Sequence, residues 1–383
     1  MKKKHLFIIA GEPSGDLHGA HLVKALRNLS SEYHFSGVAG PCLRAENVET
    51  IMPMEKFMVM GFSDVIKTFP SLYRQFYALR DHILKFQPAG VLFVDYPGFN
   101  LRMAKALRKA GYAGQLIHYI SPSVWAWGKK RIVTMAETLN LLLTIYPFEI
   151  DCFSHTPLKV QYVGNPLQEN MSEYVYEENW KKQSGLTHTY IAIFPGSRRQ
   201  EVERNLPKQL QAAAQYQKKH SEIAFGISCA HPDLQPIIED RISKEGISNT
   251  YIIPSKYTYE LMRDCHSAIA KSGTVTLELA LHRRPTVVVY ELSFLNWLIA
   301  KFLIRPNLSH YCIVNILSNK RVFPELIEKG FNKENLLLQL ENIHEGPIRE
   351  NCIKDCEKIA ELFYQSKASD NAAQAIESLF QKV

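Results

Sequence analysis

Pro195-Gly-Ser-Arg198 joins an apolar run, 191–194, to a charged segment with helical character. A strand, a tight turn and a helix N-terminus in that order direct unpaired backbone N–H groups and the positive end of a helix dipole at one point. Arg198 adds a guanidinium that can bind two phosphate oxygens at once. Gly196, Ser197 and Arg198 therefore predict a diphosphate site, although an ordinary turn with a solvated Arg explains the same residues. The Lys-Ser/Thr ending of an ATP-type phosphate loop is missing, so ATP hydrolysis is not indicated.

A second loop of this kind follows a short apolar run further along the chain. Ser272, Gly273 and Thr274 offer backbone and hydroxyl donors to an anion. Glu278, one helical turn later, can accept two hydrogen bonds from a ribose diol, and a solvated helix carboxylate is the other interpretation of it. Two such loops in one half of the chain favour a nucleoside-diphosphate site more strongly than either loop alone.

Carboxylates at the ends of two earlier apolar runs are candidates for acid–base chemistry. Asp95 follows the run 91–94, where a general base would deprotonate an acceptor hydroxyl. A helix-capping role is the alternative for Asp95. Glu12 and Asp16 follow the first apolar run, and they can either orient substrate hydroxyls or bind backbone amides in a tight turn.

The segment 118–131 combines hydroxyls, two Trp residues and a basic triplet. Ser123 and Trp125 are candidates for contact with a sugar, by hydrogen bonding and stacking. The residues that would contact a lipid phosphate are Lys129, Lys130 and Arg131. A packed loop with a solvated basic patch explains the same residues. A Ser–His hydrolase is disfavoured because the segment contains no Gly-x-Ser-x-Gly turn.

Two apolar stretches, 51–69 and 294–304, fit acyl-chain contact at a membrane surface as well as ordinary core packing. The candidate residues for acyl-chain or membrane contact are Met58, Phe62, Phe69, Trp297 and Phe302. Residues 287–304 read as a strand and an amphipathic helix, since charged and polar residues interrupt them. The sequence has no His-Glu-x-x-His, paired Cys or Asp-x-Asp motif, so we expect no metal site and no cofactor.

The elements that position these residues alternate between short apolar runs and amphipathic segments. We expect strands at 6–10, 35–39, 90–94 and 116–120, and helices at 17–29, 71–86 and 101–110. After a polar segment, strands are expected at 190–194, 224–228, 251–253, 268–270 and 285–290. Such alternation predicts parallel sheets with ligands at the carboxyl ends of the strands. We therefore predict an α/β protein with two doubly wound, Rossmann-like domains that face each other across a cleft.

The expected domains are 1–166, which would bind the acceptor, and 167–345, which would bind a nucleotide. Residues 346–383 read as two helices, the second capped near Ser369 or Asp370. Whether this tail packs on the first domain or on a second copy of the chain, as in a homodimer, stays open.

The composition suits a cytoplasmic globular protein with an anionic partner. The chain has 383 residues, 46% of them hydrophobic, which is enough for two domains of ordinary size. A net charge of +7 suits a nucleotide, a phosphorylated substrate, a nucleic acid or an anionic membrane, and does not choose among them. Seven scattered cysteines indicate a reducing compartment.

Together these stretches resemble lipid-A-disaccharide synthase, a glycosyltransferase family of the two-domain type B (GT-B) fold. The matching segments are 10–16, 38–41, 59–61, 95–100, 118–127, 195–198, 272–274 and 277–278, with Tyr311 and Asn315. The Pro-Gly-Ser-Arg turn is shared with wider nucleotide-sugar families. Ser-Pro-Ser-Val-Trp-Ala-Trp, at 121–127, is far more selective.

The resemblance implies a reaction that joins UDP-2,3-diacylglucosamine to 2,3-diacylglucosamine 1-phosphate (lipid X), giving a β-1,6-linked disaccharide and UDP in lipid A biosynthesis. Asp95 would be the base, the two loops would bind UDP, and Asn315 would reach the nucleotide. Acceptor or sugar contacts would come from Glu12, Ser14, Gly15, Asp16, Met60, Ser123 and Trp125. The enzyme would be inverting and metal-independent, and it would attach peripherally to the anionic cytosolic face of the inner membrane, with no nucleic acid as partner.

Two alternatives are retained. One is an enzyme similar to UDP-N-acetylglucosamine 2-epimerase, which would share the fold and the nucleotide loops but need no acyl-binding surface. The other is a non-catalytic basic protein that binds RNA or an anionic membrane.

Overall fold

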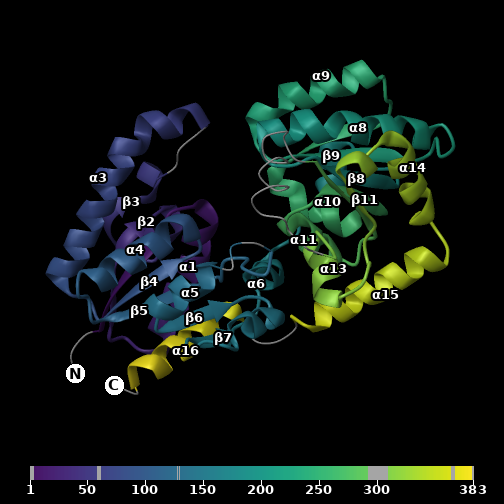
Figure 1. Cartoon of the computed structure of the whole chain (residues 1–383). Coiled ribbons are helices and arrows are strands. Elements are labelled where there is room, and N and C mark those ends of the chain that lie inside the picture. Colours follow the sequence, from purple (N-terminus) through teal and green to yellow (C-terminus); the bar gives the residue numbers. More distant parts are fainter. Residues whose placement is uncertain are drawn as a thin grey trace. The chain divides into compact units, whose positions relative to one another are not determined.

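The computed structural model of the protein describes residues 4–57, 62–126, 128, 130–291, 309–363 and 367–381, without the side chains of 62–71. The chain forms two compact units (Figure 1). The first contains Met1–Glu169 and Gln365–Val383, and the second contains Asn170–Tyr364. The expected boundary at 166 therefore lies three residues early, and the tail is divided between the two units.

The first unit is built on a parallel sheet of seven strands in the order β3-β2-β1-β4-β5-β6-β7. The strands are β1 (Lys4–Ala10), β2 (Tyr33–Ala39), β3 (Glu49–Pro53), β4 (Gly90–Val94), β5 (Gln115–Tyr119), β6 (Leu141–Thr144) and β7 (Lys159–Tyr162). The sequence predicted the four central strands and missed the others. The two edge strands, β3 and β7, are largely half-buried and lack a clear apolar run, and β6 has only four residues.

Helices cover both faces of this sheet. They are α1 (Pro13–Leu29), α2 (Pro41–Ala45), α3 (Phe62–Phe86), α4 (Pro97–Lys109), α5 (Lys130–Thr138), α6 (Pro166–Glu173) and α16 (Ala368–Gln381). Alternate residues of β1 face opposite layers, as the strand period of two requires. Leu6 and Ile8 pack with α1 and α16, whereas Phe7 and Ile9 pack with α3, α4 and α5. The buried sheet thereby fixes where the loops after its strands emerge.

The last helix, α16, belongs to the first unit, whereas α15 (Pro347–Glu361) belongs to the second. Helix α16 packs on α1 through Ala372, Ala373 and Ile376. The Ser369 amide donates to Glu169 Oε2 over 3.0 Å, and the Ser369 hydroxyl donates to the other oxygen of that carboxylate. The prediction of a cap at Ser369 or Asp370 is therefore wrong, because α16 begins at Ala368 and Ser369 bonds to α6.

The second unit repeats the architecture with six parallel strands in the order β10-β9-β8-β11-β12-β13. The strands are β8 (Tyr190–Phe194), β9 (Ala224–Cys229), β10 (Thr250–Pro254), β11 (Ser267–Lys271), β12 (Thr286–Tyr290) and β13 (Glu325–Ile327). The other helices are α7 (Trp180–Ser184), α8 (Arg199–Gln217), α9 (Gln235–Glu245), α10 (Thr258–Asp264), α11 (Thr274–Leu281), α13 (Ile313–Ser318) and α14 (Lys333–Asn342). The five strands predicted here are confirmed, and the three-residue β13 was missed.

Both sheets reverse their strand order at one point, between β1 and β4 in the first unit and between β8 and β11 in the second. Loops that follow the two strands at such a point diverge and leave a crevice for ligands. The two doubly wound, Rossmann-like domains predicted from the sequence are confirmed, while their facing across a cleft stays a prediction. Among the described residues, no helix combines the length and the apolar character needed to cross a membrane.

Candidate functional site

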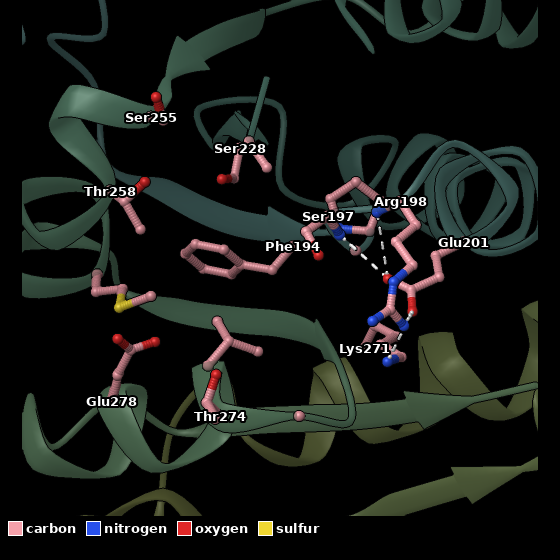
Figure 2. Close-up of a pocket in the computed structure, with 16 residues that line it drawn as sticks. Phe194, Ser197, Arg198, Glu201, Ser228, Ser255, Thr258, Lys271, Thr274 and Glu278 are labelled. Carbon is pink, nitrogen blue, oxygen red and sulfur yellow. Dashed lines mark hydrogen bonds and ion pairs between the residues drawn. The ribbon is translucent and has the colours of Figure 1, made fainter. Parts of the chain in front are cut away.

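A cavity of about 370 Å³ opens at the carboxyl ends of β8 and β11, at the point where the strand order of the second unit reverses (Figure 2). The loop Pro195–Arg198 after β8 and the loop after β11 both line it. Further lining residues are Ser228 near the end of β9, Ser255 directly after β10, and Thr258 at the start of α10. The two loops that the sequence singled out therefore meet at one cavity.

The loop after β8 depends on a glycine. Gly196 has a φ of 125°, and a Cβ there would lie 2.6 Å from Glu201 Oε2. The same Glu201 oxygen accepts hydrogen bonds from the backbone N–H of Ser197, over 3.2 Å, and of Arg198, over 3.4 Å. The expectation of unpaired N–H groups is therefore wrong for Ser197 and Arg198 in this structure, because a side chain of α8 folds back onto them.

Two cations share this carboxylate, as the dashed lines in Figure 2 show. Lys271 Nζ lies 3.1 Å from Glu201 Oε1, and an Arg198 guanidinium nitrogen lies 3.5 Å from the same oxygen. Burial alone would raise the pKa of Glu201, but Lys271, then Arg198 and the Ser197 amide, hold that pKa below its ordinary value. The Arg198 side chain is 83% exposed, so it can reorient toward a ligand.

The sequence interpretation missed Glu201 and Lys271 as parts of the site. Glu201 lies three residues after Arg198, the spacing at which a Glu side chain reaches back to the amides that begin a helix. Lys271 is the last residue of β11, so the strand prediction already placed it at the ligand edge of the sheet. Both signals were present in the sequence.

Glu278 lines the cavity from α11, well apart from the cluster of Arg198, Glu201 and Lys271 (Figure 2). Its Oε1 accepts a hydrogen bond from the Tyr259 hydroxyl over 3.2 Å. Burial raises the pKa of Glu278, and the Tyr259 hydrogen bond only partly opposes that shift. Within the described residues, no other side-chain bond to this carboxylate is present, so it keeps acceptor capacity for a ligand hydroxyl.

The remaining residues of the predicted UDP site divide into two groups. Gly273 and Thr274 line the cavity. Ser272 instead donates from its hydroxyl to the Tyr311 carbonyl over 3.3 Å. Asn315 is fully buried and accepts from the amides of Val322 and Phe323, both over 2.8 Å. These contacts make Asn315 a support for the turn before β13 and leave it outside the cavity lining.

In the first unit, Asp95 directly follows β4 in a strained turn. Asp95 and Tyr96 both have left-handed backbone angles, φ 49° and 47°, and such strain concentrates at functional sites. The Asn100 side-chain amide holds the turn by donating to the Asp95 carbonyl over 2.7 Å. The N-cap of α4 is Tyr96, without a capping side-chain bond, so the capping interpretation of Asp95 is not supported.

The Asp95 carboxyl is mostly buried, and burial followed by the nearby Glu12 charge raises its pKa. A carboxylate with a raised pKa is a stronger base. The turns after β1 and β4 also touch, because the Tyr96 ring occupies the space beside Gly11, where a Cβ would lie 2.4 Å from Tyr96 Cδ1. Glu12 and Asp95 thus lie at the strand-order reversal of the first sheet.

Asp16 binds backbone amides, as the alternative interpretation expected, but they belong to the turn after β2 and not to its own turn. It is only 1% exposed, and its carboxylate accepts from the amides of Gly40, Cys42 and Leu43 over 2.8, 2.7 and 3.2 Å. These amides begin α2, so Asp16 joins α1 to the turn after β2. Gly15 allows close packing, since a Cβ there would lie 3.2 Å from the Val94 carbonyl oxygen.

The structure describes only some of the other residues predicted to contact the sugar, the acceptor or the membrane. Ser14 and Ser123 are exposed, and Trp125 packs edge-to-face on Phe148 with ring centroids 5.6 Å apart. Lys130 is exposed at the first residue of α5, followed by Arg131. The predicted residues that lie outside the described residues are Met58, Met60, Lys129, Trp297 and Phe302; for Phe62 and Phe69 only the backbone, in α3, is described.

The comparison with solved structures identifies the fold class of the chain. The chain is similar to the solved structure of UDP-N-acetylglucosamine 2-epimerase from Neisseria meningitidis bound to UDP-N-acetylglucosamine, with a TM-score of 0.61 and full coverage of both chains. At 14% sequence identity this likeness shows the fold alone. That fold is the GT-B fold of two Rossmann-like domains.

The family follows from the sequence comparisons. The chain belongs to the lipid-A-disaccharide synthetase family, whose model matches residues 6–379. It is 38% identical to the lipid-A-disaccharide synthase of Chlamydia pneumoniae over 94% of its own length, and it spans only 60% of that relative. It is 32% identical to the enzyme of Geobacter metallireducens, covering 90% of this chain and 89% of that one. The resemblance recognised in the sequence is confirmed, and the epimerase alternative is not favoured.

Proposed function

We propose that this protein transfers the 2,3-diacylglucosaminyl group of UDP-2,3-diacylglucosamine to the 6-hydroxyl of lipid X. The observation that carries the proposal is the cavity at the strand-order reversal of the second unit, in a chain whose family match runs from residue 6 to 379. The cavity combines cations at one end with an acceptor carboxylate at the other, which suits a diphosphate joined to a ribose.

In this reaction Asp95 takes the proton of the acceptor 6-hydroxyl as its oxygen bonds to C1 of the donor sugar. The bond from C1 to the diphosphate breaks, and its electron pair leaves with UDP. A single displacement of an α-linked donor gives a β-linked product. The raised pKa of Asp95 favours proton uptake in this step. Arg198 and the start of α8 stabilise the charge that develops on the leaving diphosphate.

The lipid substrates suggest peripheral attachment to an anionic membrane on its cytosolic face. Helix α3 exposes Tyr73, which is 56% accessible, and the same helix carries Arg80 against the ring of Tyr77 at 4.5 Å. Aromatic and cationic side chains together favour the boundary between acyl chains and headgroups. A vesicle flotation assay with and without anionic lipid tests the membrane attachment separately from the transfer activity.

The test of the activity is incubation of the purified protein with UDP-2,3-diacylglucosamine and lipid X, followed by mass spectrometry. We expect one disaccharide 1-phosphate and one UDP for each donor consumed. Release of UDP without lipid X, or an epimerised donor sugar as the product, would refute the proposal.

A further inference from the structure

Four donors converge on the single carboxylate of Glu201. The amides of Ser197 and Arg198 donate to Oε2, and Lys271 and the Arg198 guanidinium lie beside Oε1. Backbone amides at the start of a helix, an arginine and a lysine are the groups that bind a diphosphate. In this structure the protein's own anion therefore occupies the donors that the proposed ligand needs.

We propose that the Glu201 carboxylate is an internal substitute for the diphosphate of UDP. When the nucleotide binds, Lys271, the second cation of the site, gives up its ion pair with Glu201 and pairs with the diphosphate. This inference rests on the proposed function, because it takes the cavity as the UDP site. It adds Lys271 as a residue that contacts the leaving group, and it predicts that the Glu201 carboxylate weakens binding of the diphosphate.

The contacts of Glu201 favour exchange over permanent occupancy. Its bonds to the two amides, 3.2 and 3.4 Å, are at or beyond the long end of the usual range for N–H donors. A diphosphate carries more negative charge than one carboxylate, so it forms stronger bonds with the same donors. The two anions also repel each other, so both cannot share Lys271 and the amides at full strength.

The same arrangement also stabilises the loop whenever no nucleotide is bound. Without Glu201, two backbone amides and the Lys271 ammonium would lack these partners in a site that is partly buried. Leaving buried donors unpaired is costly. Glu201, with 16% of its side chain exposed, satisfies them at the edge of the cavity, where it can rotate toward solvent.

A purely structural Glu201 makes the opposite prediction. If the carboxylate only caps α8 and holds Lys271 in place, its loss would disorder the loop and weaken UDP binding. If it competes with the ligand, its neutralisation strengthens UDP binding. The sign of the change in affinity separates the two roles.

The test measures binding of uridine and UDP to the full chain by isothermal titration calorimetry. For Glu201→Gln we expect UDP to bind about tenfold more tightly, or about 1.4 kcal/mol, because the variant removes the charge that competes with the diphosphate for the same donors. For Lys271→Met we expect UDP to bind about tenfold more weakly. Uridine, which lacks phosphate, should bind both variants as it binds the unmodified protein.

Glu203→Gln is the matched control. Glu203 lies on the same helix, pairs with Arg199 over 2.9 Å and has a side chain 40% exposed. Its neutralisation changes the net charge equally but leaves the loop contacts intact, so UDP affinity should stay unchanged. Equal tightening in this control would attribute the effect to net charge and overturn the inference.

Unchanged or weaker UDP binding by Glu201→Gln would also overturn it. If that variant does not fold, Lys271→Met decides, because unchanged UDP affinity there removes Lys271 from the site. Failure of the unmodified protein to bind UDP at all would instead refute the proposed function, so the two failures are distinguishable.

Discussion

Glu278→Gln should weaken binding of UDP while stabilising the fold. The carboxylate lines the cavity and keeps acceptor capacity beyond its bond to Tyr259. A ribose diol would donate to it. A hydrogen bond from the ribose to the charged carboxylate contributes about 1.5–3 kcal/mol to binding. A hydrogen bond to the neutral amide of Gln, which has the same size, contributes about 0.5–1.5 kcal/mol.

The expected loss is therefore about 1–2 kcal/mol, which corresponds to about five- to thirtyfold weaker binding of UDP. The assay is titration calorimetry with UDP and with 2′,3′-dideoxyuridine 5′-diphosphate. The second ligand has no diol, so the variant should bind it as the unmodified protein does. The difference between the two ligands isolates the ribose contact from any general effect on the cavity.

Stability should change in the other direction. Burial raises the pKa of Glu278 in the folded protein, because keeping the charged carboxylate buried costs free energy. Such a group contributes stability below its unfolded pKa and loses that contribution as pH rises through its folded pKa. At neutral pH a neutral Gln removes this cost, and thermal melting should show a higher midpoint. Weaker binding of both ligands together with a lower midpoint would refute the ribose role and make Glu278 a structural residue.

Four further predictions concern the other groups. Asp95→Asn should keep UDP binding but lower kcat by at least about a hundredfold, and near-normal turnover would remove Asp95 as the base. The Glu12 charge raises the pKa of Asp95, so Glu12→Gln should move the acid limb of the pH profile of kcat/KM to lower pH. Asp16→Ala should lower the free energy of unfolding of the first unit by about 3 kcal/mol in urea titrations, since three amides lose their acceptor, whereas a change below about 0.5 kcal/mol would contradict the burial argument. Turnover should persist in EDTA, because Arg198 and Lys271 supply positive charge at the leaving group; strict dependence on an added divalent ion would contradict this.

The strands at the centre of each sheet could be predicted because burial on both faces gives a continuous apolar run. Val91–Val94 and Tyr190–Phe194 are such runs, and each is directly followed by a loop that contains candidate site residues. The edge strand β3 carries no such signal. Glu49–Pro53 pairs with β2 on one side only and contains charged and polar residues, so tertiary pairing decides its conformation.

Side-chain roles were harder to predict than positions. The family resemblance implied an acceptor or sugar contact for Asp16 and a nucleotide contact for Asn315. Their hydrogen bonds go instead to the amides of Gly40, 24 residues after Asp16, and of Val322, 7 residues after Asn315, which only the folded chain brings to them. The same holds for Glu201, whose spacing indicates a helix start but whose pairing with Lys271 requires β8 and β11 to be neighbours.

The two units share one strand order, yet the loops at their reversal points carry opposite charge. After β1 and β4 the first unit presents the carboxylates of Glu12 and Asp95, and burial and mutual repulsion raise the pKa of Asp95. After β8 and β11 the second unit presents Arg198 and Lys271, with one carboxylate between them. The backbone sets where a ligand binds, and these few side chains set what it is. In the proposed reaction, proton removal would use the first arrangement and departure of the diphosphate would use the second. We therefore expect a variant that exchanges these residues to fold but to lose the proposed transfer.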